Sequence, residues 1–130
     1  MEPQDIRIML VEDNPVDVAF TKKVLKYNRL DKDLVIAIDG KDAMSALKRM
    51  AMEEKLPNII LLDINLPDIS GIELLTKIKE DWRFGQIPII MLTGSNIDDD
   101  IQKSYDLGAS TYLVKPISKD ALMLVIQKLF

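Results

Sequence analysis

The sequence of 130 residues contains no cysteine and no histidine. Without cysteine, the chain has no disulfide scaffold, no thiol nucleophile and no Cys-ligated metal site. Without histidine, Ser-His-Asp catalysis, His-ligated zinc and any imidazole base are excluded as well. The chemistry of this protein must therefore depend on carboxylates, hydroxyls, amides and ammonium groups.

Long apolar runs are also missing. No run approaches the length needed to span a membrane, and the first ten residues lack the basic flank and the cleavage site of a signal peptide. We therefore expect a cytoplasmic protein with no membrane partner. The 17 basic and 21 acidic residues give a net charge of −4, and the basic residues are dispersed along the sequence. This distribution does not support nucleic-acid binding.

Five short apolar runs alternate with stretches of helical periodicity. The runs are typical of buried strands and cover Ile6–Val11, Leu34–Ile38, Ile59–Leu62, Ile87–Leu92 and Thr111–Val114. The helices are expected at Pro15–Tyr27, from Asp39 through Met50, after Ser70, at Ile97–Leu107, and from Ser118 or Lys119 to Phe130. This alternation predicts a flavodoxin-like α/β domain, with a doubly wound five-stranded parallel sheet in the order 2-1-3-4-5. We expect residues 1–5 to be a tail and residues 6–130 to form the domain.

The spacing of apolar residues predicts which face of each helix is buried. In chain order, the expected inward residues are Ala19, Phe20, Val24 and Tyr27; Ala43, Ala46, Leu47 and Met50; Leu74, Leu75, Ile78 and Trp82; Ile101 and Tyr105; and Leu122, Val125, Ile126 and Leu129. The fourth helix has the poorest apolar face, so we expect it to be the least firmly docked. Gly108 fits the stop signal of that helix.

The acidic residues at the ends of the first and third expected strands are candidates for a shared site. Asp63 ends the run Ile59–Leu62, and Glu12 and Asp13 end the first run. In the predicted strand order these two strands are adjacent, so the three carboxylates should share one crevice. They would repel one another unless a cation lay between them, and oxygen ligands suit Mg²⁺. The alternative is that each acid caps a neighbouring helix.

A hydroxyl group ends the fourth expected strand, and an ammonium group follows the fifth. Thr93 closes the fourth strand and Lys115 follows the fifth. Facing a metal-bound carboxylate, these groups are what a transferred phosphoryl group needs around its oxygens. Asp63 could then be a nucleophile that forms an aspartyl phosphate. Taken singly, Thr93 also fits a turn residue and Lys115 a solvated charge.

Four motifs carry a resemblance to a known family. VEDN (11–14), LLDINLPDISG (61–71), MLTG (91–94) and YLVKP (112–116) resemble the receiver domain of two-component response regulators, over essentially the whole chain. VEDNPVD, SYDLGAS and YLVKPI resemble the single-domain regulators that are paired with phytochrome-type kinases. The resemblance implies a signalling domain that catalyses only its own phosphorylation and slow autodephosphorylation. It also implies two partners: a sensor histidine kinase, for which a phytochrome-type kinase is a candidate, and a downstream target or phosphotransfer protein.

The resemblance implies a metal-dependent phosphoacceptor. Asp63 would accept the phosphoryl group from a kinase phosphohistidine. Asp13, Asp63 and the main-chain carbonyl of Asn65 would bind Mg²⁺, for which Mn²⁺ could substitute, and Glu12 would act through a metal-bound water. A non-phosphorylated scaffold of the same fold is an alternative, although every residue that the chemistry needs is present.

Other positions take roles through the same resemblance. Thr93, Lys115 and backbone N–H groups near Asn65 and Gly94 would contact the phosphoryl oxygens. Asn65 and Ser95 would tune the rate of dephosphorylation. The peptide bond between Lys115 and Pro116 would be cis.

The resemblance also implies a conformational switch. Thr93 would move toward the phosphoryl group, and Tyr112 would swing into the space behind it. The fourth helix, the strand 111–114 and the last helix would form a surface for a homodimer or for the kinase.

Two other families with related folds fit less well. A haloacid-dehalogenase-type phosphatase needs a second aspartate two residues after the nucleophile, where this chain has Asn65. An FMN-binding flavodoxin-like module needs a phosphate loop after the first strand, where Glu12 and Asp13 would repel a phosphate.

Overall fold

The structure is a computed structural model that describes residues 2–94 and 99–130. Its helices and strands alternate along the chain. They are η1 (Pro3–Asp5), β1 (Ile8–Val11), α1 (Pro15–Tyr27), β2 (Val35–Ala37), α2 (Gly40–Met52), β3 (Ile59–Asp63), α3 (Gly71–Glu80), β4 (Ile89–Thr93), α4 (Asp99–Asp106), β5 (Thr111–Val114) and α5 (Lys119–Leu129). The first element, η1, is a short 3₁₀ helix within the segment expected to be a tail.

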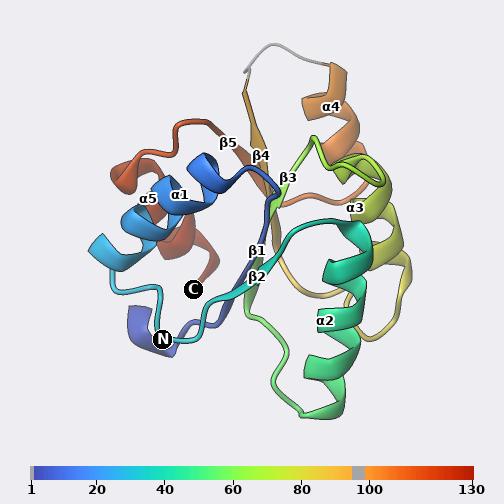
Figure 1. Cartoon of the computed structure of the whole chain (residues 1–130), viewed down its shortest axis with the longest axis horizontal. Coiled ribbons are helices and arrows are strands. Elements are labelled where there is room, and N and C mark those ends of the chain that lie inside the picture. The colour runs from blue at the N-terminus through green and yellow to red at the C-terminus, as the bar shows by residue number, and fades with distance from the viewer. Residues whose placement is uncertain (1, 95–98) are drawn as a thin grey trace.

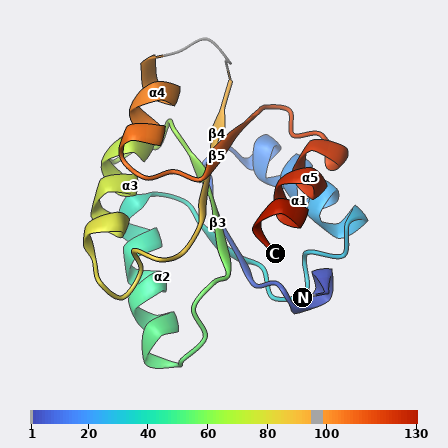
Figure 2. The same ribbon diagram turned by 180° about the vertical axis from the view of Figure 1, so that it is seen from behind.

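The five strands form one parallel sheet in the order β2-β1-β3-β4-β5, which confirms the predicted topology. Helices α1 and α5 cover one face, and α2, α3 and α4 cover the other (Figures 1 and 2). Every residue of β1, β3 and β4 is buried, whereas the edge strands β2 and β5 are only partly covered. No helix among residues 2–94 and 99–130 is long and apolar enough to span a membrane.

Alternation along the strands divides the core into two layers. Val11, Leu62 and Met91 face the layer under α2 and α3, while Leu10 and Leu61 face the layer under α1 and α5. Because both faces of the central strands are buried, their residues are apolar without interruption until the carboxyl ends.

The inner faces of three helices differ from the prediction. In α1 the buried residues are Thr21, Val24 and Leu25, whereas Phe20 and Tyr27 are 44% and 67% exposed. Ala19 is exposed as well. Apolar residues surround this helix on several sides, so spacing alone does not identify the face that packs on the sheet.

Trp82 was also expected to face inward, and the structure shows it 88% exposed. Helix α3 ends at Glu80, so the helical spacing that placed Trp82 on the inner face does not extend to it. Phe84, in the turn that follows, is fully buried instead. In α4, Ile101 is buried as predicted, but Tyr105 is 43% exposed, and Ser104 is buried as well. Ile97 and Asp98 lie outside the described residues.

Strands β1 and β4 begin two residues later than predicted. The N–H group of Arg7 donates to the Asn58 side chain at 2.7 Å, not to a neighbouring strand. Pro88 has no N–H group to give to a ladder, and its carbonyl accepts from Ile60 at 3.0 Å. Ile6 and Ile87 are nevertheless buried.

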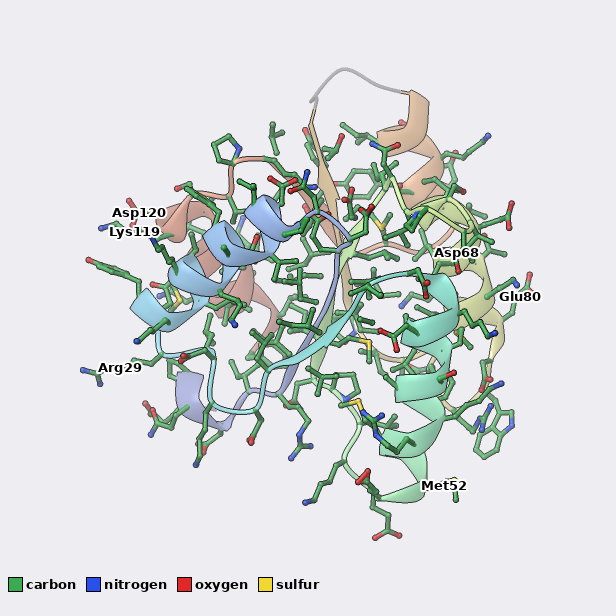
Figure 3. The ribbon with its side chains drawn as sticks, in the orientation of Figure 1. Arg29, Met52, Asp68, Glu80, Lys119 and Asp120 are labelled. Carbon is green, nitrogen blue, oxygen red and sulfur yellow. The ribbon has the colours of Figure 1, made fainter. Side chains whose placement is uncertain are left out.

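The loop between β3 and α3 is fixed at both ends. Asp68 accepts hydrogen bonds from the backbone N–H groups of Gly40 and Lys41, both at 2.9 Å, at the start of α2 (Figure 3). These N–H groups hold the pKa of Asp68 below its usual range. At the other end, the N–H group of Gly71 donates to the Ile64 carbonyl at 2.7 Å. The loop that follows Asp63 is therefore bonded both to its own strand and to α2.

Gly71 lies directly against the backbone of β3. A Cβ atom at this position would clash with the Asp63 carbonyl oxygen and would lie 2.7 Å from the Ile64 Cα atom. Gly71→Ala should lower the free energy of unfolding by about 1–3 kcal/mol, because both backbones would have to move apart. Urea denaturation measures this change.

Gly94→Ala is the matched control. A Cβ atom there meets nothing within 4 Å in the part of the chain that the structure describes, so the free energy of unfolding should change by less than about 0.5 kcal/mol. An equal loss of stability in both variants would contradict the steric explanation.

Candidate functional site

The carboxyl ends of four strands bring the candidate residues to one edge of the sheet. Val11 is paired with Leu62, so the next residues, Glu12 and Asp63, lie side by side. Thr93 is the last residue of β4, and its carbonyl accepts from the Lys115 N–H group at 2.7 Å. Segments far apart in the sequence are thereby joined by the parallel pairing of the sheet.

The Lys115 ammonium group lies at the centre of this site. Its Nζ atom is 2.6 Å from Glu12 Oε1, 2.9 Å from Asp63 Oδ2 and 3.1 Å from Asp17 Oδ2. An ammonium group has three donors, and here each has a carboxylate acceptor. Lys115 is therefore a partly buried counter-charge for three acids, and not a free charge in solvent.

Asp17 is the member of this cluster that the sequence did not indicate. It lies in the first turn of α1, where its N–H group donates to the Asn14 side chain at 3.2 Å. An acid in a first turn has an ordinary explanation, because it complements the helix dipole. Only the folded structure shows that α1 directs this carboxylate toward Lys115.

The charges of the cluster shift two pKa values. Burial, together with the neighbouring Asp63 carboxylate, raises the pKa of Glu12 to about 7, although Lys115 opposes the shift. Burial alone would lower the pKa of Lys115, but its hydrogen bonds to Glu12, Asp63 and Asp17 outweigh burial and raise it. The ammonium group therefore stays charged, and it only partly compensates the acids around it.

Glu12, Asp13 and Asp63 can hold a divalent cation. Each offers a carboxylate oxygen, and these atoms lie within 4.8 Å of one another. Glu12 and Asp63 are buried, whereas Asp13 is exposed at the mouth of a hollow of about 640 Å³, which Asn65, Gly94 and Lys115 also line. An all-oxygen donor set with an excess of negative charge and access to water fits a hard divalent cation.

Helix capping does not account for these acids. The N-cap of α1 is Asn14, whose side chain accepts from Val16 and Asp17, and the N-cap of α3 is Ser70. Asp63 accepts a hydrogen bond from the Asn65 N–H group at 3.0 Å, within its own loop. The alternative explanation, in which Asp13 and Asp63 serve as caps, is therefore wrong.

The remaining predicted residues lie at differing depths. Thr93 is buried, whereas Asn65 and Gly94 are exposed beside the hollow. The peptide bond between Lys115 and Pro116 is cis. Ser95 lies outside the described residues.

Tyr112 lies apart from the carboxylates, on β5 and facing α4. It is half-buried, and its ring meets the Tyr105 ring edge to face, with the centroids 6.1 Å apart. The Tyr105 hydroxyl is 3.1 Å from the Thr111 hydroxyl. The two tyrosines therefore join α4 to the edge strand of the sheet.

Comparison with known proteins gives one consistent result. The family model described as the response regulator receiver domain matches residues 8–127. The response regulator Rcp1 of Synechocystis sp. is 38% identical over 122 residues, which cover 92% of this chain and 83% of Rcp1.

Solved structures agree with the sequence match. The crystal structure of the Mn²⁺-bound form of Rcp1 superimposes with a TM-score of 0.74 and 37% identity, covering 95% of this chain and 90% of that one. The bacteriophytochrome response regulator RtBRR gives a TM-score of 0.85 and 35% identity, with 95% and 77% coverage. The phosphorylated cyanobacterial phytochrome response regulator RcpA gives 0.78 and 34%, with 95% and 89% coverage.

Asp13 offers a test of the cation site that does not depend on any reaction. Its carboxylate has no hydrogen bond or ion pair within the described part of the chain. In EDTA, Asp13→Asn should raise the free energy of unfolding slightly, by less than about 1 kcal/mol, because it relieves repulsion. Mn²⁺ at 100 times its dissociation constant should stabilise the unsubstituted protein by about 2.7 kcal/mol. The same Mn²⁺ concentration should stabilise Asp13→Asn by a smaller amount, because the variant has lost one ligand.

Thermal unfolding with and without metal measures both effects. Asp33→Asn makes the same change of charge away from the site and should leave the metal effect unchanged. If Mn²⁺ stabilised all three proteins equally, the cation would not bind at Asp13.

Proposed function

The chain belongs to the response regulator receiver family, and from this we propose that Asp63 is the residue that accepts the phosphoryl group. Receiver domains act in two-component signalling by accepting a phosphoryl group and switching conformation, and this is the function of the chain. The observation that carries the assignment of Asp63 is its contact with Lys115 at 2.9 Å, at the end of a fully buried strand. Of the three acids around Lys115, Asp63 lies nearest the centre of the sheet.

The transfer uses the carboxylate as a nucleophile. A carboxylate oxygen of Asp63 forms a bond to phosphorus while the bond from phosphorus to the imidazole nitrogen of a kinase phosphohistidine breaks. The electron pair stays on that nitrogen. Lys115, Thr93 and backbone N–H groups near Asn65 and Gly94 stabilise the negative charge on the phosphoryl oxygens.

Mg²⁺ is the proposed cofactor, and Mn²⁺ can substitute for it. Asp13, Asp63 and the Asn65 carbonyl would hold the ion directly, with Glu12 acting through a bound water. When bound, the ion supplies positive charge to the phosphoryl oxygens and to the crowded carboxylates. The crowding of Glu12, Asp13 and Asp63 supports this assignment, since burial and the Asp63 carboxylate raise the pKa of Glu12 although Lys115 lowers it.

The switch and the lifetime of the phosphate depend on the surroundings of the site. We assign Thr93 and Tyr112 to the switch, in which phosphorylation shifts the populations of two existing states. The half-buried position of Tyr112 beside α4 supports this assignment. Asn65 and Ser95 are assigned to tuning the rate of dephosphorylation.

A sensor histidine kinase is the proposed phosphodonor. The relatives RtBRR and RcpA are described as phytochrome response regulators, so a phytochrome-type kinase is the first candidate for this chain. Such kinases form phosphohistidine from ATP in the cytoplasm, where we therefore place the protein. The output would pass to a downstream protein or a phosphotransfer protein, with neither nucleic acid nor membrane as the direct target.

Phosphorylation of Asp63 can be tested without the kinase. After incubation with acetyl phosphate and Mg²⁺, intact-mass spectrometry should show one phosphate adduct. Asp63→Asn should show none, because an amide is not a competent nucleophile, and omission of Mg²⁺ should greatly reduce the adduct.

Asp33→Asn serves as the matched control and should be phosphorylated normally. An adduct of equal yield on Asp63→Asn would place the phosphoryl group on another residue. A steady release of phosphate from simple phosphate esters would instead indicate a phosphatase.

A homodimer through α4, β5 and α5 is the second part of the proposal. Leu124 on α5 and Val114 on β5 are 58% and 36% exposed, and Phe130 is 40% exposed. Sedimentation equilibrium should show a dimer that Leu124→Glu weakens by about tenfold, because a buried charge would have no partner. A monomer with and without a phosphate mimic would exclude this surface as a dimer interface.

A further inference from the structure

Strand β2 forms an open edge of the sheet. Within the described part of the chain, β2 is paired only with β1, and Figure 1 shows it in front of β1, between α1 and α2. The Ala37 carbonyl accepts from the Glu12 N–H group at 3.0 Å. By the alternation of a strand, the N–H and C=O groups of Ile36 point away from β1. Such an edge can pair with a strand from another chain.

A hollow of about 570 Å³ lies between β2 and α1. Its apolar floor is formed by Ala19, Leu34 and Ile36. Its basic residues are Lys22, Lys23 and Lys26, all exposed on α1, and its acidic residue is Asp31. This side of the strand therefore combines an apolar base with a row of ammonium groups.

A second hollow, of about 420 Å³, lies between β2 and α2. Leu34, Val35 and Met50 are its apolar residues. Its basic residues are Arg7, Lys32, Arg49 and Lys55, and its acidic residues are Asp33 and Glu53. The same combination of apolar and basic side chains is thus repeated on the other side of the strand.

The charge of this edge is opposite to that of the whole protein. Seven basic and three acidic side chains line the two hollows, a net charge of +4, whereas the whole chain carries −4. Arg49 is paired with Glu53 at 3.7 Å, but the ion pairs that the structure shows include no lysine of either hollow. A local excess of positive charge on an acidic protein favours an acidic ligand.

We propose that the β2 edge is a docking site for an acidic, extended peptide segment of a partner protein. The segment would pair with the outward-facing groups of Ile36, and its side chains would alternate between the two hollows. Apolar residues would contact Leu34 and Val35, and acidic residues would meet the lysines on both sides. This surface lies apart from the surface of α4, β5 and α5.

Charge and composition favour this occupant over two others. A second copy of the chain would bring two edges of charge +4 together, which repel each other. A nucleic acid would meet apolar floors, and the residues lining the two hollows include no aromatic side chain on which a base could stack.

Fluorescence anisotropy can test the proposal with the full chain. The probe is a labelled peptide of about eight residues in which pairs of glutamates alternate with pairs of valines, so that each side of the extended peptide carries both kinds of side chain. The double variants Lys22→Glu/Lys26→Glu and Lys32→Glu/Lys55→Glu should each weaken binding by about tenfold, because each reverses the charge of one hollow. Amide NMR signals of Leu34–Ile38 should shift when the peptide is added to the unsubstituted protein.

Lys77→Glu/Lys128→Glu is the matched control. It makes the same change in net charge on exposed positions of α3 and α5, and it should weaken binding by less than about twofold. Circular dichroism and phosphorylation by acetyl phosphate should be unchanged in all three variants, which separates docking from the chemistry of Asp63.

Three results would overturn the proposal. The first is equal weakening by the three double variants, which would indicate attraction by net charge alone. The second is a failure of the unsubstituted protein to bind the peptide, or binding without a shift of the amide NMR signals of Leu34–Ile38. The third is a single-stranded DNA that binds more tightly than the peptide and responds to the same variants, which would assign the edge to nucleic acid.

Discussion

The attraction between one ammonium group and the acids around it is the interaction on which this site depends. Three acids reach Lys115: Glu12 from the loop after β1, Asp17 from α1 and Asp63 from β3. The pairing of β1 with β3 brings Glu12 and Asp63 together. Without a cation, the crevice contains more negative than positive charge. This excess of negative charge fits a divalent cation, and under the proposed function that cation and Lys115 would together offset the charge of a phosphoryl group.

Most of the fold could be predicted because its determinants are local. The buried strands are short apolar runs closed by polar residues, and the caps Asn14, Asp39 and Ser70 mark where helices begin. The common edge of the strands then brings Glu12 and Asp63 together without any knowledge of side-chain packing. For the same reason, the sequence could predict that Glu12, Asp63 and Lys115 lie close together.

The errors concern features that depend on packing between distant elements. Helix α1 has apolar residues on several sides, so the exposure of Phe20 and Tyr27 follows from how it docks and not from its own sequence. Trp82 lies beyond the end of α3 at Glu80, although the spacing of apolar residues in the sequence extends the helix to Trp82. Asp17 resembles an ordinary first-turn acid until Lys115 is placed beside it. In the same way, basic residues that are dispersed in the sequence gather on both sides of β2.

The hydrogen bonds of Asp68 have a mechanical consequence. They join the loop after β3 to the first turn of α2, and Gly71 holds the other end of that loop against the strand. One wall of the crevice is therefore stiff, and displacing it would break several bonds at once. On the opposite side, β4 and β5 meet α4, where Ile101 and Ser104 are the buried residues among the side chains that the structure describes. Any displacement that begins at Asp63 would therefore have to break these hydrogen bonds before it could move the loop away from α2.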